Sequence, residues 1–546
     1  MHGRWSYPLC LWILLFIDNK IVVQCQKSPN IVFVFADDYG YHDIGYHGAE
    51  IATPNLDRLA AQGVKLENYY VQPICSPTRS QLMTGRYQIH TGLQHNIIWP
   101  SQPYGLPLEF PTLANFLKDQ GYSTHAVGKW HLGLYKKEYT PLNRGFDTFY
   151  GYWEGGEDYY TYYNCDTFHN KTIDEGPTIT RSYSPKDISS GTHDKAVQWC
   201  GYDLRDMDRP VTNMNGTYST HLYTKKAIDV INQARIAEKP FFLYLAYQAV
   251  HSPMEVPLKY LTPYANIQNK NRRIYAVMIS HLYIMAENLF LGMTSCMDEG
   301  VGNVTQALKD AGLWDNTIFI FSTDNGGEVN AGGNNWPLRG YKHTLWEGGV
   351  RGIGFVTGPL VKQQGMVSKE LMHVSDWFPT IADMVGAKVN SSLKLDGVSQ
   401  WPMINQGKRS EREEILHNID ILEPLLGKRL FEDTFDTRVR AAIRVGDYKL
   451  ITGNPGDGKW YPPPHLLKFN QSFPDPRAPD DKNVWLFNVQ EDPSEAVDLS
   501  NIYVGQVRRM LDRLQYYNST AVPPQYPQSE PDCDPKLHGG YWGPWL

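Results

Sequence analysis

Three short runs of apolar, β-forming residues limit what this chain can fold into. They are IVFVFADD at 31–38, FFLYLAYQAVH at 241–251 and TIFIFSTDNGG at 317–327, and each run stops at polar residues. Continuous apolar runs of this length are typical of strands buried on both faces, which occur in parallel sheets covered by helices. The three runs therefore predict a central sheet with helices on each side.

Helical segments lie between these runs. Residues 53–63, 111–121 and 297–312 have helical patterns, and each segment ends in glycine, a common helix terminator. Strands that alternate with helices predict an α/β fold with a large, mostly parallel sheet. Ligands bind at the carboxyl ends of the strands in such sheets, so we expect the functional site at that edge.

The C-terminal part has a different pattern. Residues 438–453 and 484–493 resemble antiparallel strands joined by proline-rich loops, and one helix is predicted near 503–515. We therefore expect a large domain at 26–409 and a small α+β domain with an antiparallel sheet at 410–546.

The N-terminus predicts passage through the secretory pathway. An apolar run from Pro8 to Ile17 follows Arg4 and is too short to span a bilayer, so residues 1–25 are interpreted as a cleaved signal peptide. Asn-x-Ser/Thr sequons are compatible with this route. The candidate glycosylation sites are Asn170, Asn215, Asn303, Asn390, Asn470 and Asn518.

The net charge limits the kinds of partner that the chain can bind, and the cysteine content indicates which cysteines form a disulfide. The net charge is -7 and no basic block stands out, which argues against a nucleic-acid partner. Five cysteines remain after residue 25, and Cys165 and Cys200, which flank a polar, aromatic-rich insertion, are predicted to form a disulfide. The odd count leaves at least one thiol for another purpose, and the partners of Cys296 and Cys533 stay open.

One apolar segment, 277–291, has no clean helix caps. His281, Glu287 and Asn288 lie within it, so it is a poor candidate for a membrane span. A surface extension of the following helix is the simplest interpretation, and no stable membrane span is expected in the chain.

Oxygen-bearing side chains follow two of the predicted strands. Asp37 and Asp38 end the first run, and Asp324 and Asn325 end the third. Three carboxylates and an amide oxygen, without histidine or cysteine, suit a hard divalent cation such as Ca²⁺ or Mg²⁺. For either pair alone, capping of a turn or helix is the stronger interpretation.

Cys75 lies in a polar stretch, VQPICSPTRSQLMTGR. Its neighbours are polar, which opposes burial, and Pro77 precedes a predicted helix over SQLMTG. Cys75 and Arg79 would then face a site at a helix N-terminus, where anions are favoured. The alternatives are a buried structural thiol or half of a disulfide.

Four further residues have weak individual signals but a common location. In GYSTHAVGKWHLG, Lys129 and His131 are expected on one face of an extended segment. His251 follows the second buried strand, and Lys342 lies in a glycine-rich loop at 332–352. Their shared placement past strand ends makes them site candidates.

Together these motifs resemble a known family. CSPTR at 75–79 is similar to the C-x-P-x-R signature of type I sulfatases, in which the cysteine is oxidised to formylglycine after translation. GYSTHAVGKWHLG, the ADD after the first strand and TDNGG after the third match the same family. The resemblance spans 29–546 and is strongest to the branch that contains arylsulfatase B (N-acetylgalactosamine-4-sulfatase) and arylsulfatases I and J.

The resemblance implies an alkaline phosphatase-like fold, formylglycine made at Cys75 by a formylglycine-generating enzyme, and one Ca²⁺ ion. It places the metal ligands at Asp37, Asp38, Asp324, Asn325 and the modified Cys75. Arg79 and Lys129 would hold the formylglycine, with His131 beside it. His251 and Lys342 would contact the sulfate and its ester oxygen.

The implied activity is hydrolysis of a sulfate ester, with N-acetylgalactosamine 4-sulfate units of dermatan and chondroitin sulfate as the expected substrate. The alternatives are a small dietary or steroid-like sulfate ester, a related phosphatase or phosphodiesterase, and an inactive secreted binding protein. The implied location is the lysosome or the extracellular space.

The sequence differs in two places from the sulfatases that it resembles. Ser101 and Gly105 stand where relatives carry cysteines, so Cys533 is expected to lack its usual partner. Removing 277–291 would join Ala276 to Gly292 in the form that relatives show. We therefore treat this segment as an anomalous insertion, and a retained intron or a gene-model error is our hypothesis for it.

Overall fold

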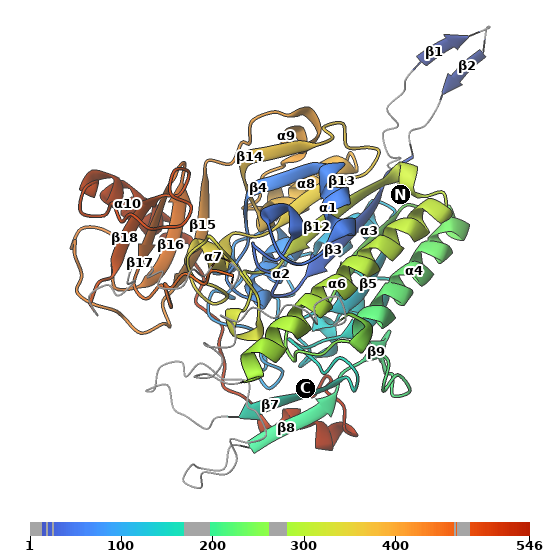
Figure 1. Cartoon of the computed structure of the whole chain (residues 1–546), viewed down its shortest axis with the longest axis horizontal. Coiled ribbons are helices and arrows are strands. Elements are labelled where there is room, and N and C mark those ends of the chain that lie inside the picture. The colour runs from blue at the N-terminus through green and yellow to red at the C-terminus, as the bar shows by residue number, and fades with distance from the viewer. Residues whose placement is uncertain are drawn as a thin grey trace, which may run out of the picture.

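The three apolar runs form neighbouring parallel strands at the centre of one large sheet (Figure 1). They are β3 (Asn30–Ala36), β11 (Phe241–Ala246) and β12 (Thr317–Thr323), with β3 between the other two. This computed structural model describes residues 14–17, 20–23, 27–168, 197–260, 281–463, 466 and 481–546.

The large sheet has ten strands and mixed directions, as predicted for a mostly parallel α/β fold. Five adjacent strands, from β6 to β12, are parallel to one another, whereas β13 is antiparallel to both of its neighbours. The order across the sheet is β10 (Arg209–Pro210), β9 (Arg205–Asp206), β6 (Thr148–Tyr152), β5 (Ser123–Lys129), β11, β3, β12, β13 (Gly354–Thr357), β4 (Val64–Tyr70) and β14 (Met366–His373).

Alternate side chains of the central strands enter two separate cores. Val32 and Val34 of β3 lie in the first core, whereas Phe33 and Phe35 lie in the second. This alternation is the two-residue period of a strand covered on both faces. The first core is closed by α1 (Pro54–Ala61), α4 (Ser219–Ala237) and α6 (His281–Asp310), and the second by α2 (Cys75–Thr84), α3 (Leu113–Asp119), α8 (Trp377–Met384) and α9 (Trp401–Gln406).

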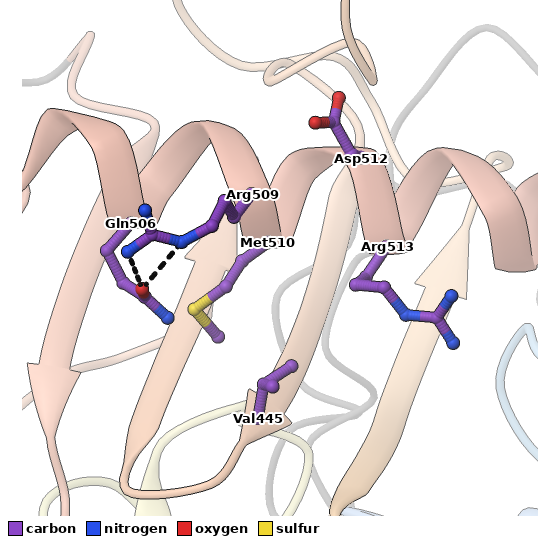
Figure 2. Close-up of a pocket in the computed structure, with 6 residues that line it drawn as sticks. All are labelled: Val445, Gln506, Arg509, Met510, Asp512 and Arg513. Atoms are coloured by element: carbon purple, nitrogen blue, oxygen red, sulfur yellow. Dashed lines mark hydrogen bonds between the residues drawn. The ribbon is translucent and has the colours of Figure 1, made fainter.

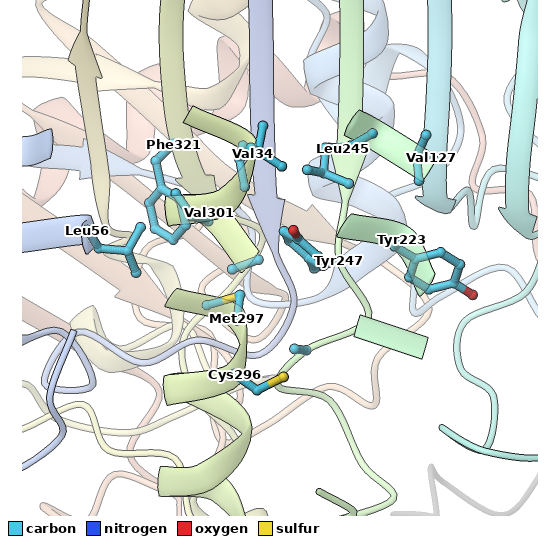
Figure 3. Close-up of a cluster of buried hydrophobic side chains, with 14 of the residues drawn as sticks. Val34, Leu56, Val127, Tyr223, Leu245, Tyr247, Cys296, Met297, Val301 and Phe321 are labelled. Atoms are coloured by element: carbon cyan, nitrogen blue, oxygen red, sulfur yellow. The ribbon is translucent and has the colours of Figure 1, made fainter. Parts of the chain in front are cut away.

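Figure 3 shows how the first core is filled. Leu245 of β11, Val34 of β3 and Phe321 of β12 lie on the same face of the sheet as Met297 and Val301 of α6, with Leu56 of α1 at the edge. The predicted helix at 297–312 is therefore present, but it begins earlier, at His281, so the apolar segment continues the helix. Residues 277–280 lie outside the described part of the chain.

A second, antiparallel sheet lies beside the first (Figure 1). Its strands are β15 (Glu414–Asp420), β16 (Arg440–Val445), β17 (Tyr448–Thr452) and β18 (Val484–Asn488), and α10 (Val504–Thr520) packs on it. This matches the antiparallel strands and the helix predicted for the C-terminal part. A surface groove of about 360 Å³ runs between α10 and β16, with Val445, Met510 and Arg513 in its lining (Figure 2).

The chain after α10 returns to the large domain. Val522 and Gln525 donate backbone hydrogen bonds to the carbonyl oxygens of Ile89 and Gly92, at 2.8 Å each. Near the end of the chain, Trp542 packs against Trp199. The tail that we placed in the small domain therefore contacts the large one.

Two hairpins complete the fold. β7 (Tyr163–Phe168) and β8 (Val197–Tyr202) pair antiparallel, and the predicted Cys165–Cys200 disulfide joins them, which confirms that prediction. β1 (Leu14–Ile17) and β2 (Lys20–Val23) form the other hairpin. Asn170, Asn470 and most of residues 1–25 lie outside the described residues. No described helix is both long and apolar enough to cross a membrane.

Candidate active site

Four of the predicted site residues lie at the carboxyl ends of β3 and β12. These strands are parallel neighbours, so Asp37, Asp38, Asp324 and Asn325 come together and are almost fully buried. The Asp38 amide donates to Asp324 Oδ1 at 3.2 Å, and Asn325 Nδ2 donates to Asp38 Oδ1 at 2.8 Å. Asp38 has a left-handed backbone, with φ of 56°, which is unusual for a residue other than glycine and typical of functional sites.

Cys75 is the first residue of α2, and its thiol faces the carboxylates. Its Sγ lies 3.6 Å from Asp37 Oδ1, and ligand atoms of Asp37, Cys75 and Asp324 all lie within 4.8 Å of one another. Burial raises the pKa of the encoded thiol to about 12. In a protein converted to formylglycine, the Sγ position would carry the aldehyde oxygen or its hydrate.

The expectation that polar neighbours keep Cys75 exposed is wrong. All ten residues of α2 are buried. Most of their polar groups have hydrogen-bond partners; for example, Ser80 Oγ donates to the Pro77 carbonyl at 2.8 Å and Thr84 Oγ1 donates to the Ser80 carbonyl at 2.7 Å. Burial costs little free energy when each polar group has a partner, so polarity alone misjudged this helix.

Arg79 projects from the second turn of α2 and is completely buried. Its guanidinium donates to Asp324 Oδ2 at 2.8 Å and lies 3.7 Å from Asp37 Oδ2. It also donates to the Tyr244 hydroxyl at 3.3 Å. Sequence reasoning missed Tyr244 because it lies inside a strand with no local signal; only the pairing of β11 beside β3 brings it to the site.

Lys129 and His131 reach the site differently from the prediction. Lys129 ends β5, and its ammonium lies 2.5 Å from Asp37 Oδ2. The strand stops there, and His131 adopts a left-handed backbone with φ of 58°, so the two residues do not share a face of an extended segment. His131 Nε2 lies 3.1 Å from the Ile98 carbonyl oxygen, while the Ser76 hydroxyl accepts the Ile98 amide at 3.1 Å.

His251 and Lys342 both approach Asp38. The Lys342 ammonium lies 2.8 Å from the Asp38 carboxylate, and His251 Nε2 lies 3.8 Å from it. Burial raises the pKa of Asp38, but the charges of Lys342 and His251 outweigh burial and hold that pKa well below its usual range. Burial and the neighbouring Lys342 charge lower the pKa of His251 to about 3.

The same residues meet the requirements of a divalent cation. Burial and the adjacent Asp37 charge raise the pKa of Asp324 to about 7, as expected for carboxylates pressed together without a cation between them. Asn325 Oδ1 is buried and has no hydrogen-bond partner among the described residues. An oxygen-only donor set with one unused buried oxygen fits a hard cation such as Ca²⁺.

The site therefore has three features: a reactive position at a helix N-terminus, carboxylates suited to a cation, and a surrounding set of basic side chains. Arg79, Lys129 and Lys342 supply positive charge, and two imidazoles lie beside them. This arrangement is chemically suited to the hydrolysis of an anionic ester with the help of a divalent cation.

Comparison with known proteins identifies the class. The Sulfatase family model matches residues 29–387, more than half of the chain. The chain belongs to the sulfatase family, whose members hydrolyse sulfate esters and generally use a formylglycine and a divalent metal ion.

Individual relatives agree with this assignment. Arylsulfatase J of Mus musculus is 47% identical over 526 residues, which cover 95% of this chain and 80% of the relative. N-acetylgalactosamine-6-sulfatase of Mus musculus is 30% identical over 417 residues, covering 74% of this chain and 71% of the relative. The solved structure of Ps i-CgsB in complex with k-i-k-neocarrahexaose has a TM-score of 0.69 at 27% identity, covering 94% of this chain and 98% of that one.

Proposed function

We propose that this chain removes sulfate from N-acetylgalactosamine 4-sulfate units of dermatan and chondroitin sulfate, with formylglycine at position 75 as the nucleophile. The observation that carries the chemistry is the placement of Cys75 at the start of α2, within 4.8 Å of the Asp37 and Asp324 ligand atoms.

The residues that would hold Ca²⁺ are Asp37, Asp38, Asp324, Asn325 and residue 75. When present, the formylglycine hydrate would supply a hydroxyl nucleophile for the sulfur, and the cation would offset charge on the sulfuryl oxygens. Arg79 and Lys129 are buried and both contact Asp37, whose Oδ1 lies 3.6 Å from Cys75 Sγ, so they would orient the carboxylate beside the nucleophile. Buried, prepositioned charges stabilise a developing anion more than mobile ones do in water.

The side chains of His251 and His131 transfer the protons of the reaction. His251 Nδ1 lies 2.6 Å from the Ser252 carbonyl oxygen, so Nδ1 donates there and Nε2 faces Asp38 and the site. We assign the leaving oxygen's proton to Nε2 of His251, which takes up this proton from solvent when the ester binds and donates it with assistance from the Lys342 ammonium. An anionic ester beside Nε2 raises the pKa of His251 from its low value in the free site. His131 Nδ1, buried without a partner among the described residues, is our acceptor for the proton of the second hydroxyl.

The first experiment is mass spectrometry of the tryptic peptide 66–79, made in cells that contain the formylglycine-generating enzyme. We expect an aldehyde at residue 75, and Cys75→Ala should abolish sulfate release. Cys533→Ala is the matched control, since it removes another buried free cysteine outside the site. An unmodified thiol at residue 75 in fully active protein would refute the mechanism.

The second experiment addresses the substrate. The resemblance to the arylsulfatase B branch and the 47% identity to arylsulfatase J support a sulfated substrate of this group, but pocket loops can change while the core stays fixed. We expect faster sulfate release from 4-sulfated than from 6-sulfated N-acetylgalactosamine oligosaccharides. A small aryl sulfate hydrolysed faster than both would favour the alternative, a small-molecule sulfate ester.

The proposed location is the lysosome or the extracellular space, reached by way of a signal peptide at 1–25. Asn215, Asn303 and Asn390 are exposed, so a glycan can reach each of them. Glycosidase treatment of the secreted or lysosomal protein should lower its apparent mass, and an unchanged mass would argue against this route.

A further inference from the structure

Two consecutive glycines lie directly against the imidazoles of the site. Gly155 and Gly156 follow β6 and are partly exposed. A Cβ atom on Gly155 would lie 2.7 Å from Cε1 and 2.8 Å from Nε2 of His131. A Cβ atom on Gly156 would lie 3.3 Å from Cε1 of His251. The first contact is shorter than real Cβ contacts, whereas the second is only tight.

His131 has little freedom to move away from Gly155. Its side chain is buried, and Nε2 is held 3.1 Å from the Ile98 carbonyl oxygen. Its backbone amide also donates to the Trp153 carbonyl oxygen at 3.1 Å, two residues before Gly155. This bond links the histidine backbone to the chain that leads into the glycine segment, Gly155–Gly156. A shift of the ring away from Gly155 would therefore weaken the contact between Nε2 and the Ile98 carbonyl oxygen.

The glycine segment is equally constrained at both ends. Before it, the Trp153 and Glu154 amides donate to Asp203 Oδ2 at 2.9 and 2.8 Å. After it, Gln248 donates to the Glu157 carbonyl oxygen and Tyr223 donates to the Glu157 carboxylate. All of these side chains are buried, so the backbone at 155 and 156 cannot easily retreat.

We propose that Gly155 is a positioning residue for the hydrolysis: its bare backbone sets the place of the His131 ring, and Gly156 does the same for His251 with more tolerance. The inference rests on the proposed function, because it assumes that both imidazoles serve the reaction. Neither glycine has a positive φ, so alanine fits both backbones and any effect comes from the contact with the ring.

The test is a comparison of single alanine variants. We expect Gly155→Ala to lower kcat by roughly 100-fold with a smaller change in KM, since an error of about 1 Å in a catalytic group costs that much. Gly156→Ala should lower kcat several-fold at most. Gly505→Ala is the matched control, because its Cβ would meet only Arg509 Nη1, at 4.0 Å, and should leave kcat unchanged.

A double-mutant cycle separates positioning from general damage. In a His131→Ala background the ring is absent, so adding Gly155→Ala should cost almost nothing more in kcat or Tm. If Gly155→Ala alone does not fold, the cycle still tests the inference, because the double variant should fold and should have the kcat and Tm of His131→Ala. An equal loss in both backgrounds, or wild-type kcat for Gly155→Ala, would overturn the inference.

The proposed function is tested separately by the wild-type protein. If wild-type protein with formylglycine at residue 75 releases no sulfate, the function fails and the inference with it. If the wild type is active and Gly155→Ala matches it at equal formylglycine content, only the inference fails.

Discussion

At the scale of single residues, the site brings three buried carboxylates close together. Asp37, Asp38 and Asp324 share a buried volume in which Arg79, Lys129 and Lys342 offset their charge. Burial and the adjacent Asp37 charge raise the pKa of Asp324, so a cation bound among these carboxylates would stabilise their charged forms.

Removing the divalent ion should therefore lower the stability of the protein. A ligand that binds only the folded state adds about 2.7 kcal/mol when present at about 100 times its Kd. We expect a chelator to lower Tm and Ca²⁺ to restore it, as measured by differential scanning calorimetry. Asn325→Leu, which removes one oxygen donor, should weaken the restoration, whereas Asn405→Leu, outside the site, should not. A Tm that does not respond to chelator would exclude a structural role for the ion.

Sequence reasoning could place several candidate site residues at strand ends because strand ends are visible in a sequence. Asp37 and Asp324 follow continuous apolar runs, and those runs are neighbours in the sheet. Sequence reasoning did not identify Tyr244 or Gly155, because Tyr244 is an ordinary strand residue and Gly155 has no side chain. Their roles depend on distances across the fold that no local pattern encodes.

At the scale of elements, the disulfide hairpin supports the same glycine segment. Asn164 of β7 donates to the Glu154 carboxylate, next to Gly155, and the Cys165–Cys200 bond fixes β7 to β8. The sequence separation of 35 residues makes the cross-link a substantial restraint on the unfolded chain.

Removing this disulfide should destabilise the fold. The double variant Cys165→Ala/Cys200→Ala is expected to lose about 2–4 kcal/mol of unfolding free energy in urea. Cys533→Ala, which removes a free buried cysteine, serves as the comparison. A reducing agent should lower the stability of the wild type but not of the double variant, and equal sensitivity of the two proteins would contradict the prediction.

At the scale of the whole molecule, the small antiparallel sheet is joined to the large domain by a shared hydrophobic core and by a buried ionic cluster. The cluster consists of Lys449, Glu347 and Glu495. Leu345 and Trp346 pack against Ile451 and Trp485 of the small sheet. This contact adjoins the loop that carries Lys342. The sequence predicted both sheets, but not this joint or the returning tail, because the order of strands and the docking of domains depend on long-range packing.

The ionic cluster should make stability depend on pH. Burial raises the pKa of Glu495 from its ordinary 4.5 to about 7, against the lowering effect of Lys449. The folded protein then holds a proton that the unfolded chain releases between these values, so the contribution of Glu495 to stability falls as pH rises from about 4.5 to 7. Glu495→Gln should flatten this part of the urea stability profile, and an unchanged slope would contradict the assignment.

Lys449 is the centre of that cluster. Its ammonium lies 2.9 Å from Glu347 and 3.0 Å from Glu495, and all three side chains are fully buried. Lys449→Met removes the nearest cation from both carboxylates and leaves Glu347 with only Arg351, at 3.7 Å, so we expect a loss of about 3–5 kcal/mol in urea unfolding. The triple variant Lys449→Met/Glu347→Gln/Glu495→Gln removes the stranded charges and should recover much of this loss. If the triple variant is no more stable than Lys449→Met, lost packing rather than unpaired charge explains the effect.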